Sequence, residues 1–135
     1  MVVYATTGKV LLMRRREPAD FWQSVTGSLR WDEREPRVAA ARELREETGL
    51  QATVGLRALG VTHRFPILSQ WRERYAPDVH ENLEHAFALE VPAEVTININ
   101  PAEHCEYGWF TFAVAARKAS SWTNREVIER LQSEA

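Results

Sequence analysis

The sequence predicts an α+β fold in which a mixed β-sheet lies between helices. Short runs of apolar and β-branched residues alternate with a few helical segments, and turn residues separate them. No internal repeat, low-complexity tract or linker interrupts this alternation. A chain of 135 residues is long enough to bury one core and too short for two, so a single domain covering residues 1–135 is expected.

The N-terminal part of the chain predicts a β-hairpin and a third strand. Apolar β-formers at Val2–Tyr4 and Val10–Arg14 flank a turn that contains Gly8, which is typical of a hairpin. Phe21–Thr26 is the next strand candidate.

Residues 36–48 predict the first helix. Pro36 suits the first turn, because the N–H that proline lacks would be unpaired there in any residue. Gly49 is the expected stop signal, since glycine readily adopts the left-handed conformation that ends many helices.

The rest of the chain predicts three further strands and two helices. The strands are expected at Ala52–Val61, Glu84–Val91 and Tyr107–Phe110. A short helix follows from about Phe112. The last helix is expected to begin at Thr123, where Thr123 to Glu126 form a capping-box pattern and later apolar residues form a stripe.

Composition excludes several classes of partner. The formal charge of −2 provides no general attraction to nucleic acid or to an anionic membrane. No apolar run approaches the ~20 residues of a membrane span, and no signal peptide is evident.

The single Cys105 cannot form an internal disulfide, which favours the cytoplasm, and a buried structural thiol is expected. No zinc-site spacing relates the four histidines, so structural or surface roles are expected for His63, His80, His85 and His104.

Three carboxylates, Glu43, Glu46 and Glu47, share one face of the predicted 36–48 helix. Like charges at these spacings oppose the helix by about 0.2–0.5 kcal/mol per pair, and the helix dipole disfavours anions in the last turn. A divalent cation such as Mg²⁺ or Mn²⁺ would offset both costs, because it prefers carboxylate oxygens. The alternative is a solvated helix end in which Arg42 pairs with Glu46.

The segment from Gly27 to Leu50 carries a longer pattern. Five residues separate Gly27 from Glu33, and Arg42 begins the run Arg-Glu-Leu-Arg-Glu-Glu-Thr-Gly-Leu. This resembles the Nudix box, which reads Gly, five residues, Glu, seven residues, then Arg-Glu-apolar-x-Glu-Glu-x-Gly-apolar. Eight residues stand here in place of seven, and the extra one falls ahead of Pro36, where it leaves the helix register intact. The resemblance implies the Nudix fold, an α/β/α sandwich with a mixed β-sheet, and structural roles in the motif for Gly27, Glu33, Arg42 and Gly49.

Segments outside the box resemble bacterial dihydroneopterin triphosphate pyrophosphohydrolases, a Nudix subfamily. They are residues 15–28, 74–77 and 121–125. The resemblance implies substrate contacts from Arg15, Thr26, Tyr75, Ala76, Pro77, Asp78 and Ser121. Asp78 stands where relatives often carry Gly. Structural alternatives are an edge-strand charge at Arg15, a strand end at Thr26 and a helix cap at Ser121.

The same resemblance implies a hydrolytic site. Attack of water on phosphorus requires charge neutralisation and an activated, aligned water, which metal ions held by Glu43 and Glu47 would supply. Glu46 is a candidate for a further ion or for the proton of the water. In this subfamily the resemblance also points to Glu103 as base or ligand, although a surface-loop role is its plain alternative. Arg42 is expected to orient the carboxylates through ion pairs.

The expected function is therefore Mg²⁺-dependent hydrolysis of a small-molecule triphosphate, 7,8-dihydroneopterin triphosphate, to the monophosphate and pyrophosphate, a step implied for folate synthesis. Mn²⁺ is a possible substitute, and side activity on dATP and other nucleoside triphosphates is expected. The first alternative is a housecleaning nucleoside triphosphate pyrophosphohydrolase. The second is a Nudix-fold binding module without turnover, against which the intact set of helix carboxylates argues.

Overall fold

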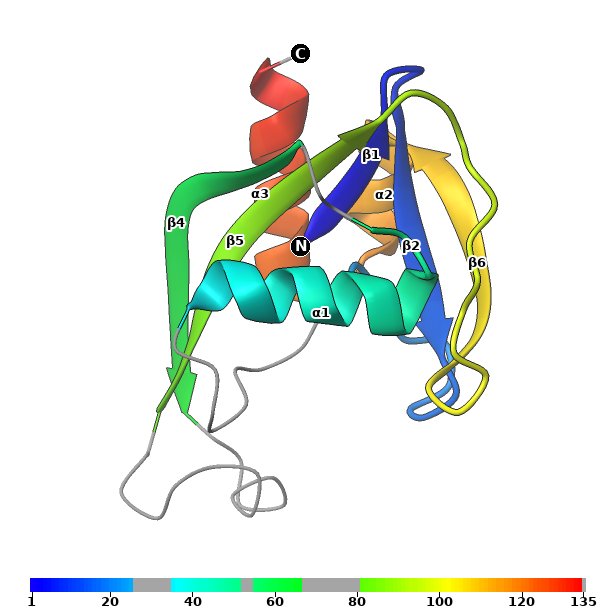
Figure 1. Ribbon diagram of the computed structural model, residues 1–135, viewed down its shortest axis with the longest axis horizontal. Helices are drawn as coiled ribbons and strands as arrows, with labels where there is room; N and C mark the ends of the chain where they lie inside the picture. Colours follow the sequence, from blue (N-terminus) through cyan, green and yellow to red (C-terminus); the bar gives the residue numbers. More distant parts are fainter. Residues whose placement is uncertain (26–34, 52–54, 67–80, 135) are drawn as a thin grey trace.

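The structure, a computed structural model, describes residues 1–25, 35–51, 55–66 and 81–134 (Figure 1). These residues form three layers. Helix α1 (Pro36–Thr48) lies on one face of a β-sheet, and helices α2 (Phe112–Lys118) and α3 (Trp122–Glu134) lie on the other. The expected α+β arrangement of a sheet between helices is confirmed.

Six strands within the described residues make up this sheet. They are β1 (Val2–Ala5), β2 (Lys9–Arg15), β3 (Trp22–Gln23), β4 (Leu56–Pro66), β5 (Glu81–Val91) and β6 (His104–Thr111). Strand β2 pairs antiparallel with β1 at its start, with β3 at its end and with β6 along its length. Strand β1 also pairs with β5 in parallel, and β5 pairs antiparallel with β4. The sheet is therefore mixed, as expected.

Alternating side chains of the first two strands divide the core between the two faces. Successive residues of a strand point to opposite faces. One buried cluster, which includes α2 and α3, contains Val2, Val10 and Leu12. The other, which includes Leu44 of α1, contains Val3, Leu11 and Met13. The predicted hairpin thus anchors both outer layers.

Helix α1 begins and ends where the sequence predicts. Pro36 occupies its first turn, and Gly49 follows it in the left-handed conformation, with φ 77°. The Gly49 amide donates to the carbonyl of Arg45 at 3.0 Å, which closes the last turn. A Cβ atom at Gly49 would lie 3.0 Å from Cβ of Asn98, so the close approach of the next segment also requires glycine.

Several sequence expectations need correction. The predicted third strand forms only over Trp22–Gln23, because the Ser24 amide donates to the side chain of Asn124 at 3.0 Å and not to a strand; Thr26 lies outside the described residues. Strand β4 begins after Gly55 and runs beyond the predicted Val61 to Pro66.

The last helix begins at Trp122, one residue before the predicted start. The Ser121 carbonyl accepts from the Arg125 amide at 3.1 Å, so Ser121 is the capping residue by position. The capping-box prediction at Thr123 is wrong, since the Thr123 hydroxyl pairs with that of Ser121 at 2.7 Å.

Cys105 is exposed, against the expectation of a buried thiol. Strand β6 begins at His104, which is three residues earlier than predicted. Because His104 occupies an inward position, strand alternation turns the next side chain outward. No helix among the described residues has the length and apolar character needed to cross a membrane.

Candidate active site

Two carboxylates and one imidazole, from segments far apart in the sequence, meet beside the C-terminal end of α1. The side chains are Glu47 in the last turn of α1, Glu103 in the turn before β6, and His104 at the start of β6. One ligand atom from each lies within 4.8 Å of those of the other two. Glu47 and His104 are buried, at 2% and 1% exposure, whereas Glu103 is exposed. We call these three residues the Glu47 cluster.

Backbone hydrogen bonds hold the turn that carries Glu103. The segment between β5 and β6 runs past the end of α1 (Figure 1), where the Asn98 amide donates to the Thr48 carbonyl at 2.9 Å. The Glu103 amide then donates to the Asn100 carbonyl at 3.0 Å, and the Glu103 carbonyl accepts from the Arg16 amide at 3.0 Å. The backbone of Glu103 is therefore held at both its amide and its carbonyl.

The other two carboxylates of the helix face share one arginine. Arg42 contacts Glu43 at 2.6 Å and Glu46 at 3.2 Å. The Arg42 side chain is only 10% exposed, so these ion pairs lie in a partly desolvated position. The expectation that Arg42 orients the carboxylates through ion pairs is consistent with this geometry. Glu43 and Glu46 do not belong to the Glu47 cluster.

Arg15, the predicted phosphate contact, ends β2 beside the cluster. Its partner in the β2–β6 register is His104, and its Nε donates to the carbonyl of Glu17 at 2.8 Å. A guanidinium in this place adds positive charge next to an acidic site, where a phosphate would need it.

Ser121, predicted to contact substrate, lies at the start of α3 and outside the cluster. The neighbouring Ser120 exchanges two hydrogen bonds with the backbone of Trp22, at 2.9 and 3.0 Å. Strand β3 thus connects the start of α3 with the cluster, because its Trp22 bonds to Ser120 and its Gln23 contacts His104. The remaining predicted residues, Thr26, Gly27, Glu33, Tyr75, Ala76, Pro77 and Asp78, lie outside the described residues.

His104 is a residue that sequence reasoning missed. Its Nε2 lies 3.3 Å from Nε2 of the buried Gln23, and its Nδ1 has no hydrogen-bond partner among the residues that the structure describes. Burial lowers the pKa of the imidazole; the Glu103 carboxylate opposes this effect and the charge of Arg15 adds to it. The buried position of His104 agrees with the expected structural role, but Nδ1 is left without a partner within the described residues. The one sequence signal was the adjacency of two metal-ligating residue types at 103 and 104.

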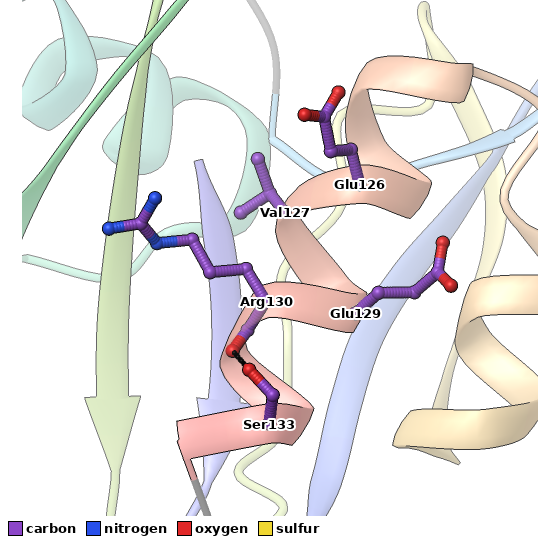
Figure 2. A pocket seen from close by; sticks show the side chains of 5 residues that line it. All are labelled: Glu126, Val127, Glu129, Arg130 and Ser133. Carbon is purple, nitrogen blue, oxygen red and sulfur yellow. Dashed lines mark hydrogen bonds between the residues drawn. The ribbon is translucent and has the colours of Figure 1, made fainter.

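A hollow lies along α3, on the opposite face of the sheet from α1 (Figures 1 and 2). Its lining consists of Glu126, Val127, Glu129, Arg130 and Ser133. Figure 2 shows the two glutamates extending in different directions and Ser133 turned back to the carbonyl of Arg130, to which its hydroxyl donates at 2.7 Å. All five lining residues belong to α3, so no side chain from another segment joins them to form a site.

Comparison with known proteins identifies the family. A model described as NUDIX domain matches residues 1–131. The chain belongs to the Nudix family.

Two bacterial relatives of this Nudix chain carry the same name. The chain is 41% identical over 134 residues to an Escherichia coli K12 protein named dihydroneopterin triphosphate diphosphatase, covering 96% of this chain and 87% of the relative. A Haemophilus influenzae protein of the same name is 34% identical, covering 96% and 83%. The solved E. coli dihydroneopterin triphosphate pyrophosphohydrolase superposes with a TM-score of 0.84 at 40% identity, covering 99% of this chain and 92% of that one.

The Glu47 cluster suits the divalent metal ions that Nudix hydrolases generally use. Carboxylate oxygens are the ligands that hard divalent cations prefer, and the buried Glu47 would otherwise carry an anion near the end of a helix, where the dipole disfavours it. The donor set therefore fits such an ion, since Glu47 and Glu103 offer two carboxylate groups within reach of each other.

Proposed function

We propose that this Nudix hydrolase converts 7,8-dihydroneopterin triphosphate to dihydroneopterin monophosphate and pyrophosphate, with Mg²⁺ as the cofactor. The observation that carries the proposal is the 41% identity over nearly the whole chain to a relative with that named activity. The convergence of Glu47 and Glu103 supports it, because hydrolysis of a phosphoanhydride requires a cluster of this chemistry.

The roles of the described side chains follow from their positions. When bound at Glu47 and Glu103, the metal would supply charge neutralisation and lower the pKa of a coordinated water. Glu103, which is exposed and fixed at the edge of the site, is our candidate to accept the proton of the attacking water. Arg15 is our candidate for the phosphate contact, with a planar fork that suits phosphate oxygens.

Glu43 and Glu46 would act from the rim of the site. Both already pair with Arg42, which keeps two like charges close together on the helix. A triphosphate brings more than one site for a cation, and these two carboxylates are candidates for a further metal ion. Glu46, 40% exposed, also remains an alternative base.

The pterin or base would be recognised by residues outside the Glu47 cluster. Thr26, Tyr75 to Asp78 and Ser121 are the candidates, and they follow from the subfamily resemblance of the sequence. A site built chiefly around a triphosphate also predicts slower turnover of dATP and other nucleoside triphosphates.

The proposal includes the setting of the enzyme. We propose a single catalytic domain over residues 1–135 that acts on a small molecule in the cytoplasm. The free, exposed Cys105 supports this location, because exposed thiols persist in reducing compartments.

A substrate panel tests the proposal. Purified protein with Mg²⁺ is assayed on dihydroneopterin triphosphate, dATP and an oxidised purine triphosphate, and products are identified by phosphorus NMR. We expect pyrophosphate from all three and the highest kcat/KM on the pterin, by about tenfold or more, which corresponds to about 1.4 kcal/mol of transition-state discrimination. A higher kcat/KM on a purine triphosphate would favour the housecleaning alternative, and no pyrophosphate from any substrate would favour the binding module.

A further inference from the structure

We infer that the imidazole of His104 is a direct nitrogen ligand of the cation held by Glu47 and Glu103, and that Gln23 positions this imidazole. The inference rests on the proposed function, since it requires a metal ion at those two carboxylates. It adds a nitrogen ligand, which the two carboxylates do not provide.

The burial of His104 leaves one ring nitrogen to be explained. The side chain is 1% exposed, and Nδ1 has no hydrogen-bond partner among the described residues. Leaving a buried polar atom without a partner costs free energy comparable to a lost hydrogen bond. A ring nitrogen of His104 also lies within 4.8 Å of the carboxylate oxygens of Glu47 and Glu103. A cation bound between these groups would give Nδ1 the partner that the protein does not.

The contact with Gln23 determines which nitrogen is available. Nε2 of His104 lies 3.3 Å from the side-chain nitrogen of Gln23, and both side chains are buried. If the amide donates here, Nε2 accepts and the ring proton sits on Nδ1, which is then a buried donor without an acceptor. If the amide is turned over, its oxygen accepts from Nε2–H, and Nδ1 keeps its lone pair for a cation.

Only the second arrangement satisfies both nitrogens once a cation binds. It is also the usual arrangement of a metal-bound histidine, in which the other ring nitrogen donates to a fixed acceptor that sets the tautomer. Gln23 is therefore a positioning residue in this inference and touches neither metal nor substrate.

The size of the cluster agrees with one shared ion. Three ligands that share one divalent ion at about 2.0–2.2 Å lie about 3–4 Å from one another. The ligand atoms here lie within 4.8 Å of one another, so a closer approach of up to about 1 Å would complete the site.

A nitrogen ligand changes which metal binds best. Carboxylates and water suit Mg²⁺ and Mn²⁺ alike, whereas imidazole favours transition metals. The inference therefore predicts that His104 strengthens the binding of Mn²⁺ much more than that of Mg²⁺.

Electron spin-echo spectroscopy of Mn²⁺ bound to the full chain tests this directly. The variant is H104F, which keeps a planar ring and removes both nitrogens, and the matched control is H85F, at a histidine of β5 outside the cluster. We expect nitrogen modulation from a coordinated imidazole in the wild type and H85F and none in H104F. Calorimetry should show Mn²⁺ affinity about 10–100-fold weaker in H104F and Mg²⁺ affinity changed less than about threefold.

Each outcome is decisive. Bound Mn²⁺ without nitrogen modulation in the wild type overturns the His104 inference and leaves the carboxylate metal site standing, and this result needs no folded variant. Equal Mn²⁺ affinity in H104F and the wild type overturns it as well. Failure of the wild type to bind either ion overturns both the inference and the metal-dependent function proposed above.

Discussion

The amide of Asn98 donates to the carbonyl of Thr48 at 2.9 Å and thereby ties the segment before β6 to the end of α1. Thr48 itself is anchored, because its hydroxyl donates to the carbonyl of Leu44 at 2.6 Å. Glu47 directly precedes Thr48, and Glu103 lies in the turn that follows Asn98. This contact, together with the backbone bonds of Glu103 to Asn100 and Arg16, holds the turn of Glu103 near the end of α1.

Replacing Glu47 with Gln is expected to reduce kcat/KM by roughly 100-fold or more, because a buried oxygen ligand loses its charge. The melting temperature of the metal-free protein should be unchanged or higher, since an anion is removed from the end of a helix. Steady-state kinetics and thermal denaturation in EDTA measure the two effects. E129Q, at an exposed position of α3, is the control and should match the wild type. A large loss of stability in metal-free E47Q would contradict this account of the helix face.

Glu103→Gln should lower kcat more than it changes KM. A residue that accepts a proton in the transition state contributes about 10²–10⁴-fold to the rate, while the amide keeps the size of the side chain. E94Q, which alters an exposed glutamate of the same connecting segment, is the matched control. Unchanged kcat in E103Q would remove Glu103 from the reaction, and a rise in KM alone would assign it to substrate binding.

Gly49→Ala should destabilise the protein and also slow turnover. Alanine would pay about 1–3 kcal/mol for the left-handed backbone and would in addition press on Cβ of Asn98, 3.0 Å away. G8A is a matched control, because Gly8 also has a positive φ, 90°, but no atom within 4 Å of the new Cβ. We expect urea denaturation to show a greater loss in G49A, and only G49A to lose activity. Equal losses of stability with full activity in both would show that the contact with Asn98 does not shape the site.

The stability of the metal-free protein should depend on pH through His104. Burial lowers the pKa of this imidazole in the folded state below its ordinary value of 6.5. Between the two pKa values the unfolded chain binds more protons, so the free energy of unfolding rises with pH there and falls as the pH drops below about 6.5. Urea denaturation in EDTA at about pH 5.5, 6.5 and 7.5 should show this fall in the wild type and a smaller one in H104F. Parallel pH profiles for the two proteins would contradict it.

The parts of the fold that depend on local chemistry were predictable from the sequence. Helix α1 runs from Pro36 to Thr48 as predicted, because proline at the start and glycine after the end act on their own turns. The hairpin of β1 and β2 formed for the same reason, with Gly8 in its turn.

The assembly of the site depends on contacts between distant segments, which no local pattern encodes. Glu103 was a candidate only through family resemblance, and its place beside Glu47 depends on backbone bonds between distant segments, such as that from Asn98 to Thr48 and that from Arg16 to Glu103. The inward position of His104 follows from the β2–β6 register, in which it pairs with Arg15. A single histidine at the start of a strand belongs to no alternating hydrophobic pattern, so its inward position could not be predicted from the sequence.

Anomalous diffraction from crystals soaked in Mn²⁺ tests the central claim most directly, that Glu47 and Glu103 together hold the divalent ion. We expect a peak within about 2.0–2.4 Å of a carboxylate oxygen of each residue, and its loss in crystals of E47Q. A fully occupied Mn²⁺ elsewhere, with no density between these two carboxylates, would contradict the account.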